Sequence, residues 1–250
     1  MPASRPERDG SPAARRRPAL RVALLGRFEL TVDGVRRDIG KGARRIVALL
    51  ALNRDGLSRK SAAALLRPHL EPGSARGSLR MELGRLRSRA PAGLIEDDGT
   101  DLRLAPHVTV DVEEVEALAA SVAGKTAPLP DMTVIERLSQ ELLPDWDDDW
   151  VESERTGFRN LTLNALDEYA RALAERGHRD AVLAITRRVL RREPLRESTV
   201  AVLVEMFLAQ GNQAEVASVY LDLRARMKKE MGIEPSLQLR ALVARVLERR

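Results

Sequence analysis

The stretch that decides the fold is SARGSLRMELGRLRSRA, residues 74–90. Leu79, Leu83 and Leu86 recur at i, i+4 and i+7, which predicts an amphipathic helix with one stripe against a core. At about 100° per residue, the opposite face is small and basic. It consists of Gly77, Arg80, Met81, Gly84, Arg85 and Ser88. Pro91 ends the helix, because its ring and its missing N–H cannot continue the hydrogen-bond ladder.

The sequence before this helix predicts a small sheet followed by two shorter helices. Alternating apolar residues around the Asp33-Gly34 turn indicate strands, whereas apolar residues at helical spacing indicate helices. Ser58 is a suitable N-cap for the second helix. The predicted elements are strands at Arg21–Leu25, Phe28–Val32 and Val35–Ile39 and helices at Ala43–Leu52 and Arg59–Leu66.

A short hairpin is expected after the helix, from Leu94–Glu96 and Leu102–Leu104, with its turn at Asp97-Asp98-Gly99-Thr100. Strands, three helices and a hairpin, in that order, are the plan of a winged helix-turn-helix with a small N-terminal sheet. We assign residues 20–110 to this domain. Residues 1–19 are rich in Pro, Ala and Arg without periodicity, and they predict a disordered basic arm.

Residues 111–250 predict an all-α domain that contains a repeat. GHRDAV at residues 177–182 recurs as GNQAEV at residues 211–216, an offset of 34 residues. This is the length of a tetratricopeptide-like helix-turn-helix, and such units stack to bury their faces. Each Gly suits a turn that requires positive φ. The predicted helices are Asp111–Ala120, Val134–Leu142, Leu163–Glu175, Asp180–Arg191, Thr199–Ala209 and Gln213–Lys229, with Leu237–Leu247 as a cap.

The charge of the chain changes sign between the two halves. Residues 21–110 carry 17 Lys and Arg against 10 Asp and Glu, whereas residues 111–250 carry 20 against 25. A basic half joined to an acidic half is typical of a nucleic-acid reader with a protein-facing module.

Composition excludes several other classes of protein. The 250 residues include no Cys and only three scattered His, so disulfides and thiolate sites are excluded and no metal or cofactor is expected. No catalytic constellation or phosphate-binding Gly loop stands out, and we expect no enzymatic activity. Without a run of ~20 apolar residues or a secretory signal, we expect a cytoplasmic protein that makes no membrane contact.

Six segments together resemble the Streptomyces antibiotic regulatory proteins, or SARP regulators. They are VALLGRFEL (22–30), SARGSL (74–79), LGRLR (83–87), LLPDWDDDWV (142–151), PLRES (194–198) and EMGIEPS (230–236). The resemblance implies an OmpR-type winged helix followed by a bacterial transcriptional activator domain of tetratricopeptide-like repeats. It also implies an activator of a secondary-metabolite or similar gene cluster, which binds promoter direct repeats as a homodimer and recruits RNA polymerase or a sigma factor.

This resemblance makes the helix at residues 74–90 the expected recognition helix in the major groove. Arg80 and Arg85 lie on its outward face and are candidates for base contacts, because Arg pairs with guanine N7 and O6. Arg76 and Arg87 flank the apolar stripe and are candidates for phosphate contacts. Further phosphate candidates, at the starts of the two preceding helices, are Lys41, Arg44, Arg59 and Lys60. The alternative for each residue is ordinary surface charge.

Two glycines within the recognition helix also have two interpretations. Gly77 and Gly84 each cost roughly 1 kcal/mol relative to Ala in a helix. Either the helix backbone approaches DNA closely at these positions, or glycine is simply tolerated on a solvated face.

The expected wing contradicts the other signals for DNA binding. Its tip carries Asp97, Asp98 and Asp101 with only Arg103 nearby, whereas wings of the family carry a basic residue and a Gly-Tyr pair. Three carboxylates would be repelled by phosphate. An alternative function is therefore a helical-repeat interaction scaffold whose winged domain binds DNA weakly or not at all.

The segment at residues 145–150 combines two Trp with four Asp. We expect Trp146 and Trp150, at i and i+4, to pack under the first repeat. The four Asp lack the Gly and the distal Glu of a calcium loop, and we expect them to flank a solvated helix N-terminus instead.

Overall fold

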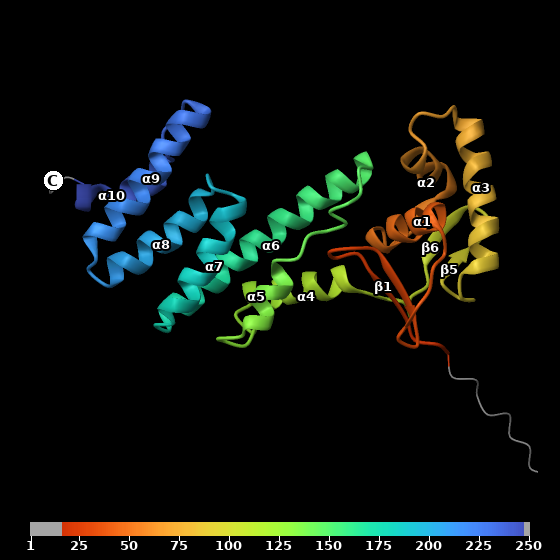
Figure 1. Ribbon diagram of the computed structural model, residues 1–250, viewed down its shortest axis with the longest axis horizontal. Coiled ribbons are helices and arrows are strands. Elements are labelled where there is room, and N and C mark those ends of the chain that lie inside the picture. The colour runs from red at the N-terminus through yellow and green to blue at the C-terminus, as the bar shows by residue number, and fades with distance from the viewer. Residues whose placement is uncertain (1–16, 248–250) are drawn as a thin grey trace, which may run out of the picture. The chain divides into compact units, whose positions relative to one another are not determined.

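The computed structural model describes residues 17–247, which form two compact units (Figure 1). The first unit comprises residues 17–22 and 29–109, and the second comprises residues 23–28 and 110–247. The predicted arm lies outside the described residues except for residues 17–19. Within the described part of the chain, no helix is long and apolar enough to cross a membrane.

The first unit contains two small sheets. Asp33 and Gly34, with φ of 50° and 79°, form the tight turn between β2 and β3 and confirm the predicted hairpin. One sheet has the order β3-β2-β1-β7, from β1 (Leu20–Ala23), β2 (Glu29–Val32), β3 (Val35–Arg36) and β7 (Thr109–Val110). The other has the order β4-β6-β5, from β4 (Leu57–Ser58), β5 (Ile95–Asp97) and β6 (Asp101–Leu104).

Three helices pack with these sheets: α1 (Lys41–Leu52), α2 (Arg59–Leu66) and α3 (Pro72–Arg89). The Ser58 hydroxyl accepts the Ser61 N–H at 3.0 Å, which confirms the predicted cap of α2. The predicted stripe of α3 is buried, with Leu79, Leu83 and Leu86 at most 4% exposed. α3 begins two residues before the predicted start, because Pro72 fits the first turn of a helix without losing a hydrogen bond.

The second unit is helical, as predicted. Its helices are α4 (Asp111–Ala123), α5 (Met132–Leu138), α6 (Asp149–Glu175), α7 (Arg179–Arg192), α8 (Glu197–Ala209), α9 (Gln213–Met231) and α10 (Leu237–Leu247). α5 is shorter than the predicted helix and ends at Leu138, whereas α6 is a single helix that begins 14 residues before the predicted start at Leu163.

The repeat has the predicted turn chemistry. Gly177 and Gly211 have φ of 78° and 70°, a conformation that side chains with a Cβ rarely adopt. These glycines separate α6 from α7 and α8 from α9, and neighbouring helices pack in sequence order. α10 packs on α8 and α9 as the terminal cap.

Residues 23–28, from the last residue of β1 to the start of β2, belong to the second unit. The buried Asp111 carboxylate accepts the N–H groups of Leu24 and Leu25 at 2.8 and 3.0 Å. The Leu143 N–H also donates to the Leu24 carbonyl at 2.9 Å. We call residues 23–28 the excursion. The sequence alone does not indicate it, because the residues that bind its backbone are more than 80 positions away.

The excursion changes the interpretation of the two Trp residues. Trp146 precedes α6 and Trp150 lies in its first turn, so the two residues do not lie on one helix. Instead, Trp146 stacks on Phe28 at 6.1 Å between ring centroids and meets Trp150 edge-on at 6.3 Å. The aromatic cluster therefore packs around the excursion.

Candidate nucleic-acid interface

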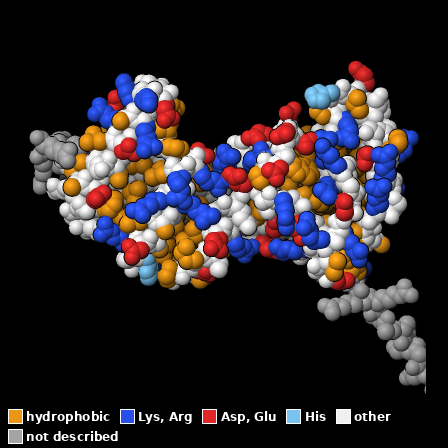
Figure 2. Space-filling model, viewed as in Figure 1, with side chains coloured by type: hydrophobic (Ala, Val, Ile, Leu, Met, Phe, Trp, Pro, Cys, Tyr) orange, Lys and Arg blue, Asp and Glu red, His pale blue; other side chains and the backbone are white. Residues whose placement is uncertain are grey.

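The outward ridge of α3 is exposed over most of its length, and only Gly77 of its six residues is half-buried. Arg80, Gly84, Arg85 and Ser88 are exposed, and the Met81 side chain is 61% exposed. α3 carries five Arg and a single Glu, and Lys and Arg side chains gather over this helix in Figure 2. The structure thus presents a basic helical surface of the width that a DNA major groove admits.

Arg80 is the least constrained cation on the ridge. Among residues 17–247 it has no ion-pair or hydrogen-bond partner for its side chain. Within the same described range, Arg76 makes only a hydrogen bond from Nε to the Pro72 carbonyl at 3.2 Å. The charges of Arg80 and Arg76 are therefore directed to solvent.

Arg85 is partly neutralised by the acidic residue of α3. Its guanidinium lies 3.0 Å from the Glu82 carboxylate, and its side chain is 58% exposed. Glu82 is only 19% exposed and lies against Gly42 of α1, where a Cβ would collide with the carboxylate. Glu82 therefore points to the core edge of the helix.

Asp97 does not project from the wing as an exposed acid. Its side chain is 7% exposed, and it accepts hydrogen bonds from both Arg59 of α2 and Arg87 of α3. Arg59 is bidentate, with Nη2 at 2.6 and 2.7 Å from the two carboxylate oxygens. We name this group, Asp97 with Arg59 and Arg87, the wing clamp. The expectation that three carboxylates at the wing tip repel phosphate therefore needs a correction. Asp97 is already paired with two cations, and of the three only Asp98 and Asp101 are exposed acids.

The environment of Asp97 favours its ionised form. Burial raises the pKa of this carboxyl, but the hydrogen bonds from Arg59 and the Gly99 N–H, with the charges of Arg59 and Arg87, hold the pKa below its usual value. Asp98 is shaped by the turn itself, because the N–H groups of Asp101 and Thr100 donate to its carboxylate and lower its pKa.

The remaining predicted phosphate contacts lie at the starts of α1 and α2. Lys41 and Lys60 are exposed, and neither has an ion-pair partner among the described residues. Arg44 instead pairs with Asp38 at 2.9 Å. The Gly40 N–H and the Arg44 guanidinium lower the pKa of Asp38, so this carboxylate is ionised at neutral pH.

Sequence reasoning missed the wing clamp. Counting charges treats an Asp at a hairpin tip as exposed, and only the fold reveals that Asp97 faces two helices. One signal was available: Asp97 is the last residue of β5, where alternation places every second side chain toward the core.

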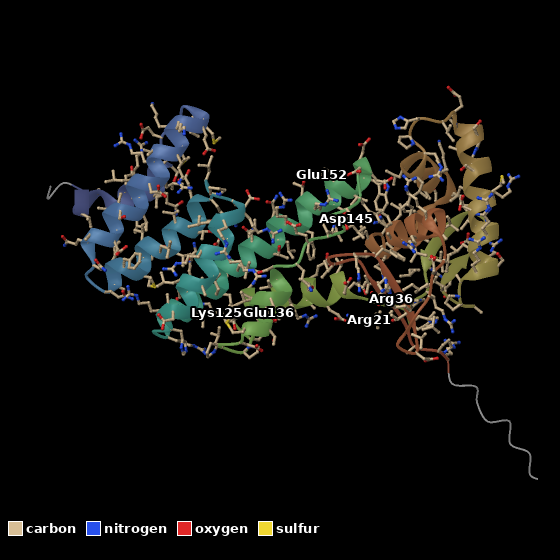
Figure 3. The ribbon with its side chains drawn as sticks, in the orientation of Figure 1. Arg21, Arg36, Lys125, Glu136, Asp145 and Glu152 are labelled. Carbon is tan, nitrogen blue, oxygen red and sulfur yellow. The ribbon has the colours of Figure 1, made fainter. Side chains whose placement is uncertain are left out.

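The acidic segment before α6 shows no sign of a cation site. Asp148 is the N-cap residue of α6 and Asp149 lies in its first turn, where acids suit the helix dipole. Figure 3 shows the labelled Asp145 and Glu152 at this end of the helix. No group of three or more potential metal ligands occurs among residues 17–247.

Three comparisons with known proteins bear on this chain. Residues 135–247 match the model of the bacterial transcriptional activator domain. The chain is 26% identical over 243 residues to the regulatory protein AfsR of Streptomyces coelicolor, covering 92% of this chain and 24% of that protein. It is also 26% identical over 161 residues to AfsR of Streptomyces griseus, covering 61% of this chain and 15% of that protein.

A solved structure shares the fold. Mycobacterium tuberculosis EmbR, in complex with a low affinity phosphopeptide, superposes with a TM-score of 0.75 at 23% identity over 93% of this chain and 66% of that one. The chain spans only about a quarter or less of the two curated relatives. Residues 135–247 thus carry a bacterial transcriptional activator domain, and the chain is similar over most of its length to a Streptomyces regulatory protein.

Proposed function

We propose that the chain is a transcriptional activator that binds promoter DNA through residues 20–110 and recruits RNA polymerase through residues 111–250. α3 lies in the major groove, and two protomers occupy direct-repeat sites. The observation that carries this proposal is the exposed ridge of α3, on which basic and small side chains meet solvent over an otherwise well-packed helix. The activator domain match and the regulatory relatives support it.

The proposed DNA contacts fall into base contacts and phosphate contacts, and the ion pairs of each side chain decide how readily it reaches a base. Arg80, unpaired among the described residues, reads a guanine edge, and the exposed Met81 beside it contacts a thymine methyl group. Arg85 reaches bases only by exchanging its pairing with Glu82. The other basic residues contact phosphate and set the register of the protein on the duplex. These are Arg76, Arg87, Lys41, Arg44, Arg59 and Lys60.

The test is a titration of the full chain against its own upstream promoter region at several salt concentrations. Binding through phosphates releases counterions, so the affinity should fall steeply with salt. It should also exceed the affinity for an unrelated duplex of the same length. Weak binding that is indifferent to sequence would instead support the interaction scaffold.

Two substitutions locate the interface on α3. We expect Arg80→Ala to cost about 1–3 kcal/mol on a cognate site, and Arg85→Ala to cost less within that range because Glu82 already occupies Arg85. Arg240→Ala removes the same charge from an exposed position on α10 and is the matched control. Unchanged affinity in both α3 variants would remove this helix from the mechanism.

A further inference from the structure

A groove of about 420 Å³ lies in the second unit between α7, α8 and α9. Its floor is apolar, because Val200 and Leu203 of α8 line it and are buried, and the half-buried Leu190 forms a wall. The volume falls within the roughly 300–1,000 Å³ of sites that hold a drug-sized ligand. It is enough for a few apolar side chains of a partner.

The rim of this groove is basic, although the second unit as a whole has more acidic than basic residues. Arg187 and Arg191 line the groove from α7, are exposed, and have no ion-pair partner within residues 17–247. Their i, i+4 spacing places both on one side of the helix. Arg226 faces them from α9 and pairs with Asp222 at 3.1 Å, an exposed pair that an incoming carboxylate can exchange at little cost.

We propose that this groove binds a short acidic, amphipathic segment of a protein partner. Apolar side chains of the segment lie on the floor, and its carboxylates pair with Arg187, Arg191 and Arg226. Figure 2 shows hydrophobic side chains bordered by Lys and Arg over the repeat helices. The inference rests on the partner-binding role proposed above for residues 111–250. It specifies which kind of segment the partner presents to the groove.

Two other occupants fit the groove less well. Duplex DNA offers phosphates to the rim, but it leaves the apolar floor unmatched and meets the Asp222 carboxylate. A second copy of this chain offers an acidic cluster at residues 145–149, but the apolar residues beside that cluster are already packed. Leu142 and Leu143 are at most 1% exposed, and Trp150 is 8% exposed. A separate polypeptide with free apolar side chains suits both parts of the groove.

The test uses the full chain, without DNA, and a labelled peptide long enough for about four helical turns. The peptide carries Leu and Phe at i, i+4 and i+7 and Asp or Glu elsewhere. A second peptide has the same composition with its apolar residues scattered around the helix. We expect the first peptide to bind several-fold more tightly in fluorescence anisotropy, because only its apolar face can match the floor.

Substitutions in the groove then assign the site. We expect the Arg187→Glu, Arg191→Glu double variant to weaken the first peptide about tenfold, because two attractions become repulsions. Leu190→Ala should weaken the first peptide but not the scattered one. Arg240→Glu makes the same charge change outside the groove and should leave binding unchanged. Circular dichroism checks folding, and Arg187→Gln serves if the double variant does not fold.

Several results would overturn the proposal. They are equal binding of both peptides, unchanged affinity of the groove variants, displacement of the peptide by duplex DNA, and self-association of the chain that the groove variants abolish. Since no DNA is present in the peptide assay, these results leave the promoter titration unaffected. A failed titration beside successful peptide binding would refute only DNA recognition.

Discussion

Each unit of the molecule contains a buried carboxylate that forms an ion pair with arginine. The two sites differ in how exposed the paired arginines are. In the wing clamp, Asp97 binds Arg59 and Arg87, whose side chains are 34% and 64% exposed. In the repeat unit, Asp167 of α6 binds Arg196, which is 17% exposed. The Ser198 and Thr199 hydroxyls also donate to Asp167, at 2.7 and 2.6 Å.

The difference lies in what else the cation can reach. Arg196 precedes α8, and its group ties the start of α8 to α6. The cations of the wing clamp extend from α2 and α3 into solvent, where phosphate can share them. The same chemistry therefore joins two helices where the cation is enclosed, whereas the exposed cations of the wing clamp stay open to the phosphate contacts proposed above.

The largest expected effect is on the enclosed group. Asp167→Ala leaves Arg196 without its carboxylate and the fully buried Thr199 hydroxyl without its acceptor. We expect a loss of about 3–5 kcal/mol in the unfolding free energy of the second unit. Urea denaturation measures it, with the exposed neighbour Glu168→Ala as the control. A loss as small as that of the control would remove the contrast between the two carboxylates.

Asp97→Asn tests the exposed group. It should lower the stability of the first unit by about 2 kcal/mol, the usual worth of hydrogen bonds to a charged group. The variant should also bind unrelated duplex more tightly, since the unit gains net positive charge, and discriminate less between cognate and unrelated DNA. Asp55→Asn removes an exposed charge from the same unit as the control. Unchanged discrimination would make the wing clamp purely structural.

The contribution of Asp97 to stability should also depend on pH. Because the pKa of Asp97 in the fold is below its usual value, its contribution to stability is complete above the usual Asp value of about 3.9. That contribution disappears as the pH falls through the lower, native value. The stability difference between wild type and Asp97→Asn should thus be constant from about pH 5 to 7 and shrink below about pH 4. Denaturation across this range measures it, and a difference that grows in acid would contradict the assignment.

The smallest expected effects come from two exposed helical glycines, one in each unit. Gly84 of α3 and Gly157 of α6 both face open space, so Ala at either position should stabilise its helix by up to about 1 kcal/mol. Only Gly84→Ala should weaken cognate DNA binding, by a few-fold, because in the proposed docking of α3 its methyl group would hold the helix backbone away from the duplex. If Gly84→Ala binds DNA as tightly as Gly157→Ala does, the glycine is merely tolerated.

Local signals predicted most of the fold, and contacts between distant segments account for the rest. The Asp33-Gly34 turn, the Ser58 cap, the leucine stripe of α3 and the two repeat glycines depend on neighbours within a few residues, which the sequence displays directly. The wing clamp joins residues 38 apart, and Asp111 holds residues 86 and 87 positions away. No periodicity encodes such pairs. The predicted DNA-contact residues were chosen from charge and helix position, and their ion pairs with Glu82, Asp38 and Asp97 became visible only in the structure.

The excursion of residues 23–28 limits how the two units can be recombined. The backbone passes from one unit to the other three times, near residues 22, 28 and 109. A gene truncated after Thr109 still encodes Leu24 and Leu25 but not the carboxylate that accepts their amides, so the truncated product exposes a segment shaped for an absent neighbour. A domain swap with a single junction near residue 109 would therefore transfer an incomplete first unit. A complete first unit also needs a new loop in place of residues 23–28.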